Sequence, residues 1–480
     1  MELYRDIDIQ AITDKLDQIV DESIIIKNKL LEPNIDEYRN VMQIIKDFIM
    51  KKKRVIYGGT AYNELIKLKK KSDAIYNDLD RKDIEFYSPK PIEDLIELAD
   101  LLHEKKFKYV QARQAQHDET YSIFVNFEQI CDITYMPSNI FLNMPTITIA
   151  GILYPDPLWI LVDILRQYND PITSYWRLKD KTFFRASILL KHYPLQLNHG
   201  TIPLEDKMLD DKIKIFKKIS EMQTLIFLGS VAETYYKERN SKIDTSYLEC
   251  YSVNFLNDVK LINKIIEKEL GTKYKKIKIN VYKPFYQFRD DTVDFTLDGI
   301  TIIKIYGNNG ICIPFHQLHL KDGKIDQVEK IQLGGYYSKS KSKNKKNNDM
   351  NTLKIGTFMV VFNNLLIQKH YEYINRTENY KIIESKMYNL LKARLEYLKK
   401  HSITVTDNSP FKEFIIKCSG ETMESFRKFK LNIMKKKSLG VNYSFNYDPA
   451  RQKGSKIPDY KFNNTSGNVD SAGIKKLFSK

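Results

Sequence analysis

The chain has 480 residues, of which 42% are hydrophobic and 12% aromatic, enough apolar side chains to fill more than one domain core. This composition excludes a mainly disordered chain. The formal net charge of +16 and the sequence pI of about 9.2 indicate a polyanionic partner, most often a nucleic acid.

The sequence shows no membrane or export signal. No stretch approaches the roughly 20 consecutive apolar residues of a membrane-spanning helix, and the start MELYRDIDIQ lacks the pattern of a signal peptide. We therefore expect a soluble, intracellular protein without a membrane partner.

The cysteines are far apart in the sequence and form no CxxC pair, so we expect reduced, structural thiols. They are Cys131, Cys250, Cys312 and Cys418. The run CIPFHQLH, with Cys312, His316 and His319, has no fourth ligand, which argues against a zinc site.

Residues 1–50 carry apolar residues at helical spacing and are expected to form a helical N-terminal region. Residues 51–145 mix short β-rich runs with helices and open with RVIYGGTAYNELI, an apolar strand, the turn Gly58-Gly59-Thr60 and a helix. Glycines allow a tight turn and a close approach to a ligand, and a helix start offers free N–H groups to a phosphate. The same pattern also fits a plain strand–turn–helix corner.

Acidic residues follow on predicted strands. In DIEFYSP, Asp83 and Glu85 are two residues apart, so their carboxylates project from one face of a strand. That face is either simply solvated or neutralised by a cation, of which Mg²⁺ is the natural choice for oxygen ligands. Asp132 in QICDITYM lies within a second apolar strand, where an acid needs a partner. Together the three acids predict a two-metal site.

Asp78 and Asp80 in NDLDR form a rival pair of carboxylates. Their polar neighbours are typical of a loop, whereas the apolar residues around Asp83 and Glu85 are typical of a strand. We therefore favour Asp83 and Glu85 as the ligands.

The rest of the chain divides by pattern. Residues 146–222 are expected to form a helical middle region, and mixed α/β structure is expected over 223–400. The polar, basic run 338–351 interrupts it as a mobile loop. C-terminal helices, with one over 410–435, and a basic tail are expected within 401–480.

The mixed segment repeats the first one. TLIFLGSVAETYY compares with RVIYGGTAYNELI, YLECYSVNFLND with DIEFYSPKPIED, and IIKIY with ICDIT. At the three acid positions this second copy has a tyrosine, a glutamate and a lysine, namely Tyr247, Glu249 and Lys304. A lysine puts positive charge where a metal site needs negative charge. The pattern predicts a degenerate copy unable to hold metal, with chance similarity as the alternative.

The order strand, Gly-Gly-Thr turn, helix, Asp-x-Glu strand and lone-Asp strand resembles the nucleotidyltransferase superfamily related to DNA polymerase beta. Five ordered segments within about 50–200 resemble the catalytic subunit of poly(A) polymerases from poxviruses and giant DNA viruses. They are YGGTAYN, DIEFYSP, TYSIFVNF with CDITYMP, LVDILRQYNDP and YWRLKDKTFFRASILLKHYP. The resemblance implies an α+β chain: a nucleotidyltransferase fold of mixed sheet and helices, helical segments, and a degenerate nucleotidyltransferase-like domain.

The same resemblance implies roles for individual residues. Asp83, Glu85 and Asp132 would be catalytic and would hold two Mg²⁺ or Mn²⁺ ions. The implied nucleotide-binding residues are Gly58, Gly59, Thr60, Asn63, Arg177, Lys181 and Arg185. Tyr175 or Trp176 would stack on adenine, although for Trp176 core packing is the favoured interpretation.

We therefore expect a template-independent poly(A) polymerase that adds AMP from ATP to the 3′ end of viral mRNA. The alternatives are a CCA-adding or oligoadenylate synthase-like enzyme, and a non-catalytic RNA-binding or processivity subunit. Expected partners are the RNA 3′ end, ATP, and either a second copy of the chain or a processivity subunit. The expected location is the host cytoplasm, and the virion as well.

Overall fold

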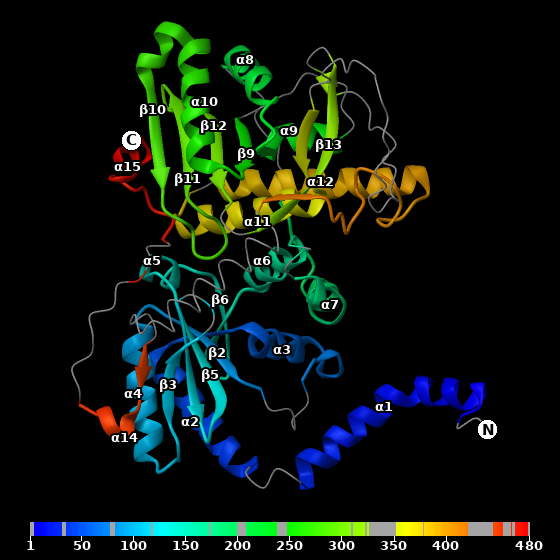
Figure 1. The fold of residues 1–480 in the computed structure, drawn as a ribbon, viewed down its shortest axis with the longest axis vertical. Helices are drawn as coiled ribbons and strands as arrows, with labels where there is room; N and C mark the ends of the chain where they lie inside the picture. The colour runs from blue at the N-terminus through cyan, green and yellow to red at the C-terminus, as the bar shows by residue number, and fades with distance from the viewer. Residues whose placement is uncertain are drawn as a thin grey trace. The chain divides into compact units, whose positions relative to one another are not determined.

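The computed structural model describes most of the chain. The described residues are 4–30, 35–76, 82–115, 117, 119–170, 172, 174–198, 208–237, 247–308, 311–321, 324–325, 352–377, 379–420, 445–454, 462 and 466–478. The chain forms two compact units, each with its own sheet (Figure 1). The first comprises Met1–Tyr135, Thr146–Asp156 and Ser444–Phe462, and the second comprises Met136–Pro145, Pro157–Tyr443 and Asn463–Lys480.

The first unit contains an eight-stranded sheet of order β17-β3-β4-β5-β2-β1-β7-β6, with α2 and α4 packed against it. Its elements in chain order are α1 (Asp6–Leu30), α2 (Ile35–Lys52), β1 (Val55–Tyr57), α3 (Gly58–Lys69), η1 (Lys71–Asp73), β2 (Ile84–Ser88), α4 (Pro91–Glu104), β3 (Gln111–Gln114), β4 (Thr120–Val125), β5 (Glu128–Tyr135), β6 (Thr146–Ile149), β7 (Ile152–Pro155), β17 (Asn446–Tyr447) and α14 (Pro449–Gln452).

Side-chain alternation in β2 sets up the site described below. Ile84 and Phe86 are buried in the core, whereas Glu85 between them is only partly buried, as the two-residue period of a strand requires. Helix α4 packs beside them and buries Leu95 and Leu102 at helical spacing. One face of β2 therefore anchors the strand, and the other is left for the carboxylate.

The second unit contains a sheet of order β10-β11-β12-β9-β8-β15-β13-β14, with β16 paired to β13. Its elements are α5 (Ser138–Phe141), α6 (Pro157–Tyr168), η2 (Tyr175–Arg177), η3 (Leu178–Phe183), α7 (Phe184–His192), α8 (Leu209–Ile219), β8 (Leu225–Phe227), α9 (Gly229–Tyr236), β9 (Leu248–Ser252), α10 (Phe255–Leu270), η4 (Gly271–Lys276), β10 (Ile277–Tyr282), β11 (Thr292–Leu297), β12 (Ile300–Gly307), β13 (Cys312–Lys321), β14 (Lys324–Ile325), β15 (Thr352–Gly356), α11 (Phe358–Ile374), α12 (Asn379–His401), β16 (Cys418–Gly420) and α15 (Gly473–Phe478). Helices α11 and α12 lie side by side (Figure 1). In the described part of the chain, no helix combines the length and the hydrophobicity needed to cross a membrane.

The two sheets share one topology. The order β3-β4-β5-β2-β1-β7-β6 in the first corresponds, strand by strand, to β10-β11-β12-β9-β8-β15-β13 in the second. The directions agree as well, because β1 with β2 and β8 with β9 are antiparallel, whereas β2 with β5 and β9 with β12 are parallel. The second copy predicted from the sequence is confirmed.

A buried polar contact repeats in both copies. Ser88 Oγ donates to Asp94 Oδ2 at 2.5 Å, and Ser252 Oγ donates to Asp258 Oδ2 at the same distance. Each pair joins the end of a strand to the first turns of the next helix, α4 or α10. A repeat at this level of detail is not explained by chance similarity between α/β units.

Several segments differ from the sequence patterns. Residues 146–155, assigned to the helical middle region, form the β6–β7 hairpin because β7 pairs in parallel with β1. A helix over 410–420 is wrong: this stretch contains turns, extended chain and β16, since β16 pairs with β13. The basic run 338–351 lies outside the described residues. The five-part division remains a prediction at a finer level than the two units.

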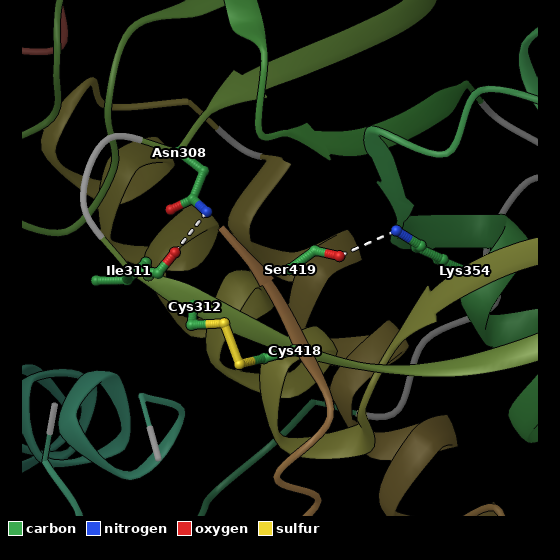
Figure 2. Close-up of a disulfide and its surroundings, with 6 residues drawn as sticks. All are labelled: Asn308, Ile311, Cys312, Lys354, Cys418 and Ser419. Atoms are coloured by element: carbon green, nitrogen blue, oxygen red, sulfur yellow. Dashed lines mark hydrogen bonds between the residues drawn. A yellow bond between two sulfur atoms is a disulfide. The ribbon is translucent and has the colours of Figure 1, made fainter. Parts of the chain in front are cut away.

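The expectation of four reduced thiols is wrong for two of them. Cys312 and Cys418 form a disulfide (Figure 2), with Cα atoms 5.3 Å apart. The strand pairing explains it, because Pro314 on β13 lies opposite Cys418 on β16 although the cysteines are 106 residues apart in sequence. Cys131 and Cys250 are free and buried, and burial raises the pKa of both thiols.

We expect reduction of the Cys312–Cys418 bond to destabilise the second unit by about 2–4 kcal/mol, because the bond closes a long loop and so restricts the unfolded chain. Calorimetry with and without dithiothreitol measures the effect. The double variant Cys312→Ser/Cys418→Ser should unfold at the temperature of the reduced wild type, and dithiothreitol should not change that temperature. Four titratable thiols in the unreduced, denatured protein would contradict the bond.

Two histidines of the second unit are buried as neutral rings. His316 on β13 is 2% exposed and His370 on α11 is 3% exposed. Burial lowers the pKa of His316 to about 4 and that of His370 to about 3. Because His316 is enclosed and Cys312 is disulfide-bonded, these two residues do not offer a zinc site, and the side chain of His319 lies outside the described residues.

These histidines make stability depend on pH. A histidine in the unfolded chain titrates near pH 6.5. Below that pH the unfolded chain therefore binds protons on these two histidines, whereas the folded chain keeps both rings neutral. Their contribution is complete above about pH 6.5 and is lost as the pH falls toward 4, with about 2 kcal/mol lost for each at pH 5. Urea unfolding between pH 7.5 and 5 measures the slope. The double variant His316→Gln/His370→Gln should flatten it, and an unchanged slope would contradict this assignment.

Candidate active site

The turn after β1 brings the backbone against a carboxylate. Gly58 begins α3 with φ +67°, and a Cβ at this position would lie 1.7 Å from Glu85 Oε2. Glycine is therefore required twice, for the left-handed backbone and for the close approach of Glu85. The N–H of Gly59 donates to the same oxygen at 3.2 Å. The first N–H groups of the helix and an acid thus meet at one point.

Strand order brings the acids to the same edge. Tyr57 at the end of β1 lies opposite Glu85 on β2, and Glu85 lies opposite Asp132 on β5. Asp83 precedes β2 by one residue, two positions from Glu85, and its charge acts on Asp132. The structure therefore gathers the three sequence-predicted acids and the glycine turn within the first unit.

The electrostatics around Asp83, Glu85 and Asp132 favour a bound cation. Burial raises the pKa of Asp132 to about 6, the hydrogen bond from Ser122 opposes the shift, and the charge of Asp83 adds to it. Asp132 Oδ1 accepts from Ser122 Oγ at 2.5 Å and from Gln129 Nε2 at 3.0 Å. A partly buried carboxylate beside other acids costs free energy that a positive ion would offset.

The donor set suits a hard divalent ion, since all three side chains offer carboxylate oxygens. Within the described residues, however, no three acidic, histidine or cysteine side chains converge into a ready-made metal cluster. Glu85 is turned toward the Gly58–Gly59 backbone, and Asp132 toward Ser122. A bound ion would have to draw these oxygens away from their present partners.

Two expected nucleotide contacts have structural partners. Thr60 Oγ1 donates to the carbonyl of Asp83 at 3.2 Å, which ties the start of α3 to the first acid. Asn63 is fully buried, and its Oδ1 accepts from the N–H of Tyr76 at 2.9 Å. The nucleotide-binding roles of Thr60 and Asn63 remain predictions.

Sequence reasoning missed Ser122 and Tyr76. Ser122 lies opposite Asp132 in the β4–β5 ladder, so the alternation of TYSIFV could have revealed it once that pairing was assumed. A Cβ added to Gly59 would come within 2.4 Å of the Tyr76 hydroxyl. No local sequence pattern predicts this contact. The rival acids Asp78 and Asp80 lie outside the described residues.

The basic side chains that were expected to bind phosphate lie in the second unit. Arg177 Nη1 donates to Gln167 Oε1 at 2.8 Å, and the guanidinium lies 4.6 Å from the centre of the Trp176 ring. Trp176 is 54% exposed, so core packing is wrong for it. Lys181 is exposed and Arg185 is half-buried, and phosphate binding by Arg177, Lys181 and Arg185 remains a prediction.

The second copy keeps the close contact between a glycine turn and a glutamate, but it lacks two of the three acids. Gly229 has φ +53°, and a Cβ there would lie 2.4 Å from Glu249 Oε2, as with Gly58 and Glu85. Lys304 lies opposite Glu249 in the parallel β9–β12 pair, where the first copy has an acid. The ammonium of Lys304 lies 5.3 Å from the centre of the Tyr247 ring. The structure therefore places Glu249 and Lys304 at the positions of Glu85 and Asp132, and the inability of this copy to hold metal remains a prediction.

Helix α11 fills the remaining space around Glu249. The carboxylate is 2% exposed, and its Oε1 accepts from Asn364 Nδ2 at 3.1 Å and also from Gln368 and Tyr306. These donors satisfy the charge that a metal would otherwise offset. The second copy is therefore a closed, hydrogen-bonded structural core at this position.

The sequence and the fold both match known proteins. The poly(A) polymerase catalytic subunit family matches residues 43–174, and the C-terminal region of the APMV poly(A) polymerase catalytic subunit matches residues 226–480. A poly(A) polymerase catalytic subunit of Acanthamoeba polyphaga mimivirus is 34% identical over 510 aligned residues, which cover 97% of this chain and 82% of that protein.

Two further matches agree with these. A poly(A) polymerase catalytic subunit of African swine fever virus is 35% identical over 169 residues, 34% of this chain and 35% of that protein. The crystal structure of the Megavirus polyadenylate synthase superposes with a TM-score of 0.84 at 32% identity, covering 98% of this chain and 93% of that chain. With a nucleotidyltransferase fold, an acidic corner beside a glycine turn and these matches over nearly its whole length, the chain belongs to the poly(A) polymerase catalytic subunit family.

Proposed function

We propose that this protein is a template-independent polynucleotide adenylyltransferase that joins AMP from ATP to the 3′ hydroxyl of an RNA and releases pyrophosphate. The observation that carries the proposal is the meeting of Asp83, Glu85 and Asp132 beside the Gly58–Gly59 turn. Membership of the poly(A) polymerase catalytic subunit family supports it and disfavours the CCA-adding, oligoadenylate synthase-like and non-catalytic alternatives.

The acids would hold Mg²⁺ or Mn²⁺. Bound divalent ions lower the pKa of a hydroxyl nucleophile and offset the charge of a triphosphate. Asp83 and Glu85 would face the triphosphate, and Asp132 would face the primer hydroxyl. Because Oδ1 of Asp132 already accepts two hydrogen bonds, Oδ2 is the atom that would take the proton of the hydroxyl.

The glycine turn would hold the phosphates. The N–H groups of Gly58 and Gly59 lie at the start of α3, where backbone donors and the helix dipole favour an anion. Thr60 and Asn63 lie within the same helix start and would support this contact. The cations Arg177, Lys181 and Arg185 are the proposed additional phosphate ligands.

The deciding experiment incubates the purified chain with a short RNA and Mg²⁺, offering each nucleoside triphosphate in a separate reaction. A ladder of extended products with ATP and little extension with CTP, GTP or UTP is expected. Extension by at most two residues with CTP alone, and by at most one residue with ATP alone, would instead indicate a CCA-adding enzyme. Oligoadenylate formed without RNA would indicate an oligoadenylate synthase-like activity.

We further propose that the protein associates with a second copy or with a processivity subunit. Helix α1 supports this, because Ile9, Ile12, Leu16 and Ile19 recur at helical spacing and are each at least 44% exposed. Such an apolar stripe on a soluble helix is typical of an interface. Light scattering measures the molar mass of the wild type and of the Ile12→Asp/Ile19→Asp variant. If α1 holds an oligomer together, the variant should have the lower mass. The host cytoplasm and the virion are the proposed locations.

A further inference from the structure

A cavity of about 190 Å³ lies within the second unit, and neither the three acids nor the Gly58–Gly59 turn lines it. The end of α6, the residues after it, the start of α11 and the strip 412–416 form its walls. Tyr168, Tyr175 and Phe414 supply aromatic surface to these walls. Pockets that enclose a whole drug-sized molecule usually measure about 300–1,000 Å³, so this cavity suits one ring system of a larger ligand.

Aromatic rings continue from the cavity onto the surface. Phe414 is 45% exposed, and its ring centre lies 5.1 Å from that of Tyr168 and 6.4 Å from that of Phe183. Tyr175 and Trp176 are 62% and 54% exposed. Phe414 also has φ +59°, a conformation that is strained for a bulky side chain. Neighbouring exposed rings of this kind are typical of surfaces on which successive nucleic-acid bases stack.

Positive charge accompanies the rings. Arg177 and Lys181 lie 4.6 and 5.8 Å from the centre of the Trp176 ring, and Lys412 lines the cavity. The carboxylate on the wall, Glu413, is already bound by the guanidinium of Arg394 and the hydroxyl of Tyr168. The surface can therefore attract a phosphate backbone.

One polar group gives the cavity a preference among bases. Asn169 lines it, and its Nδ2 donates to the carbonyl of Met359 at 3.1 Å, which sets the orientation of the amide. Its Oδ1 accepts no hydrogen bond from the part of the chain that the structure describes, so it is available to an exocyclic amino group. Adenine, cytosine and guanine carry such a group and uracil does not, so the contact disfavours uracil.

The cavity wall is covalently anchored. The strip 412–416 leads directly to Cys418, whose disulfide to Cys312 ties it to β13 (Figure 2). Pro314, which lines the cavity, lies opposite Cys418 in the β13–β16 pair. A tethered wall loses less conformational entropy when a ligand binds than a free loop would.

We propose that this cavity holds a base of the RNA chain, with adenine preferred over uracil, and that the exposed rings stack on the bases beside it. The inference rests on the proposed function for the nature of the ligand. A polynucleotide fits better than ATP alone, because several stacking faces are present and ATP has one base. The second unit thus carries a retention site for the adenylate tail.

Binding is measured by fluorescence anisotropy with labelled oligo(A) of about 15 nucleotides, in EDTA and without ATP, so that catalysis plays no part. Phe414→Ala and Tyr175→Ala should each weaken binding about tenfold, as the loss of a stacked base predicts. Tyr373→Ala, which removes a 48% exposed ring on α11, is the matched control. Asn169→Leu should narrow the preference for oligo(A) over oligo(U).

Trp176 supplies a second readout that does not depend on these variants. Trp159 is 1% exposed, so oligo(A) should quench mainly Trp176, and Trp176→Phe should remove the change. Equal affinity of wild type, Phe414→Ala and Tyr175→Ala, all folded by calorimetry, would overturn the proposal. Quenching by ATP equal to that by oligo(A) would assign the cavity to the nucleotide and overturn it as well. Neither result would affect the polymerase assignment, which the tailing reaction tests separately.

Discussion

Replacing Asp83, Glu85 or Asp132 by alanine is expected to lower AMP incorporation into RNA by about a thousandfold or more, while RNA binding and folding are retained. Each acid supplies oxygens to a site where charge develops on the nucleophile and on the triphosphate, and the loss of one such stabilising group commonly lowers the rate by about 10²–10³-fold. Glu85 and Asp132 lie opposite each other on neighbouring strands, so each would supply its oxygens from a separate position. Extension of a 5′-labelled RNA under single-turnover conditions measures the loss.

The folding stability of these variants should not fall with their activity. The charge of Asp83 helps to raise the pKa of Asp132, so in EDTA the Asp132→Ala protein should unfold at the same temperature as wild type or a higher one. Asp47→Ala, an exposed acid on α2, is the matched control and should retain full tailing. Substantial tailing by Asp83→Ala together with complete loss in Asp80→Ala would transfer the site to the rival pair Asp78 and Asp80.

Glu249→Ala is expected to show the opposite pattern, with a large loss of stability and intact chemistry. Its removal leaves the donors of Asn364, Gln368 and Tyr306 without their shared acceptor. It also removes negative charge that acts on the buried Arg289. Unsatisfied buried donors cost about 1–3 kcal/mol each, and breaking a buried ionic arrangement costs about 3–5 kcal/mol. A total loss of about 3 kcal/mol or more is therefore expected.

Urea unfolding measures this loss, and single-nucleotide addition is assayed below the transition of the variant. Glu249→Gln keeps an oxygen acceptor and should lose less stability than Glu249→Ala. Glu85→Ala is the paired variant in the first copy, with unfolding near that of wild type and no addition. If folded Glu249→Ala protein lost addition as completely as Glu85→Ala does, the second copy would be catalytic and its interpretation as a structural core would be wrong.

Local patterns in the sequence were sufficient for much of the fold. The strand, glycine turn and helix around Gly58 each depend on residues within a few positions of one another, as does the alternation that places Asp83 and Glu85 on one side of a strand. The second copy could be recognised for the same reason, because its apolar framework persists after the acids are replaced. The order of motifs was also enough to indicate a poly(A) polymerase catalytic subunit.

Other features depended on which strands become neighbours. The wide spacing of the cysteines and the lack of a CxxC pair predicted four reduced thiols, but Cys312 and Cys418 are joined because β16 pairs with β13. The helical periodicity after Pro410 was overridden over 410–420 by the same pairing. Residues 146–155 read as part of a helical region, yet they complete the first sheet through the contact of β7 with β1.

The sequence by itself determined the residue types of the site: a glycine turn, two acids two positions apart at the start of one strand, and a third acid on another strand. Only the tertiary structure decided that Glu85 lies opposite Asp132 and against Gly58, that Ser122 donates to Asp132, and that α11 encloses Glu249. The physical reason is range. Turn and strand preferences act between near neighbours in the chain, whereas these contacts form only after the order of the strands in each sheet has been chosen.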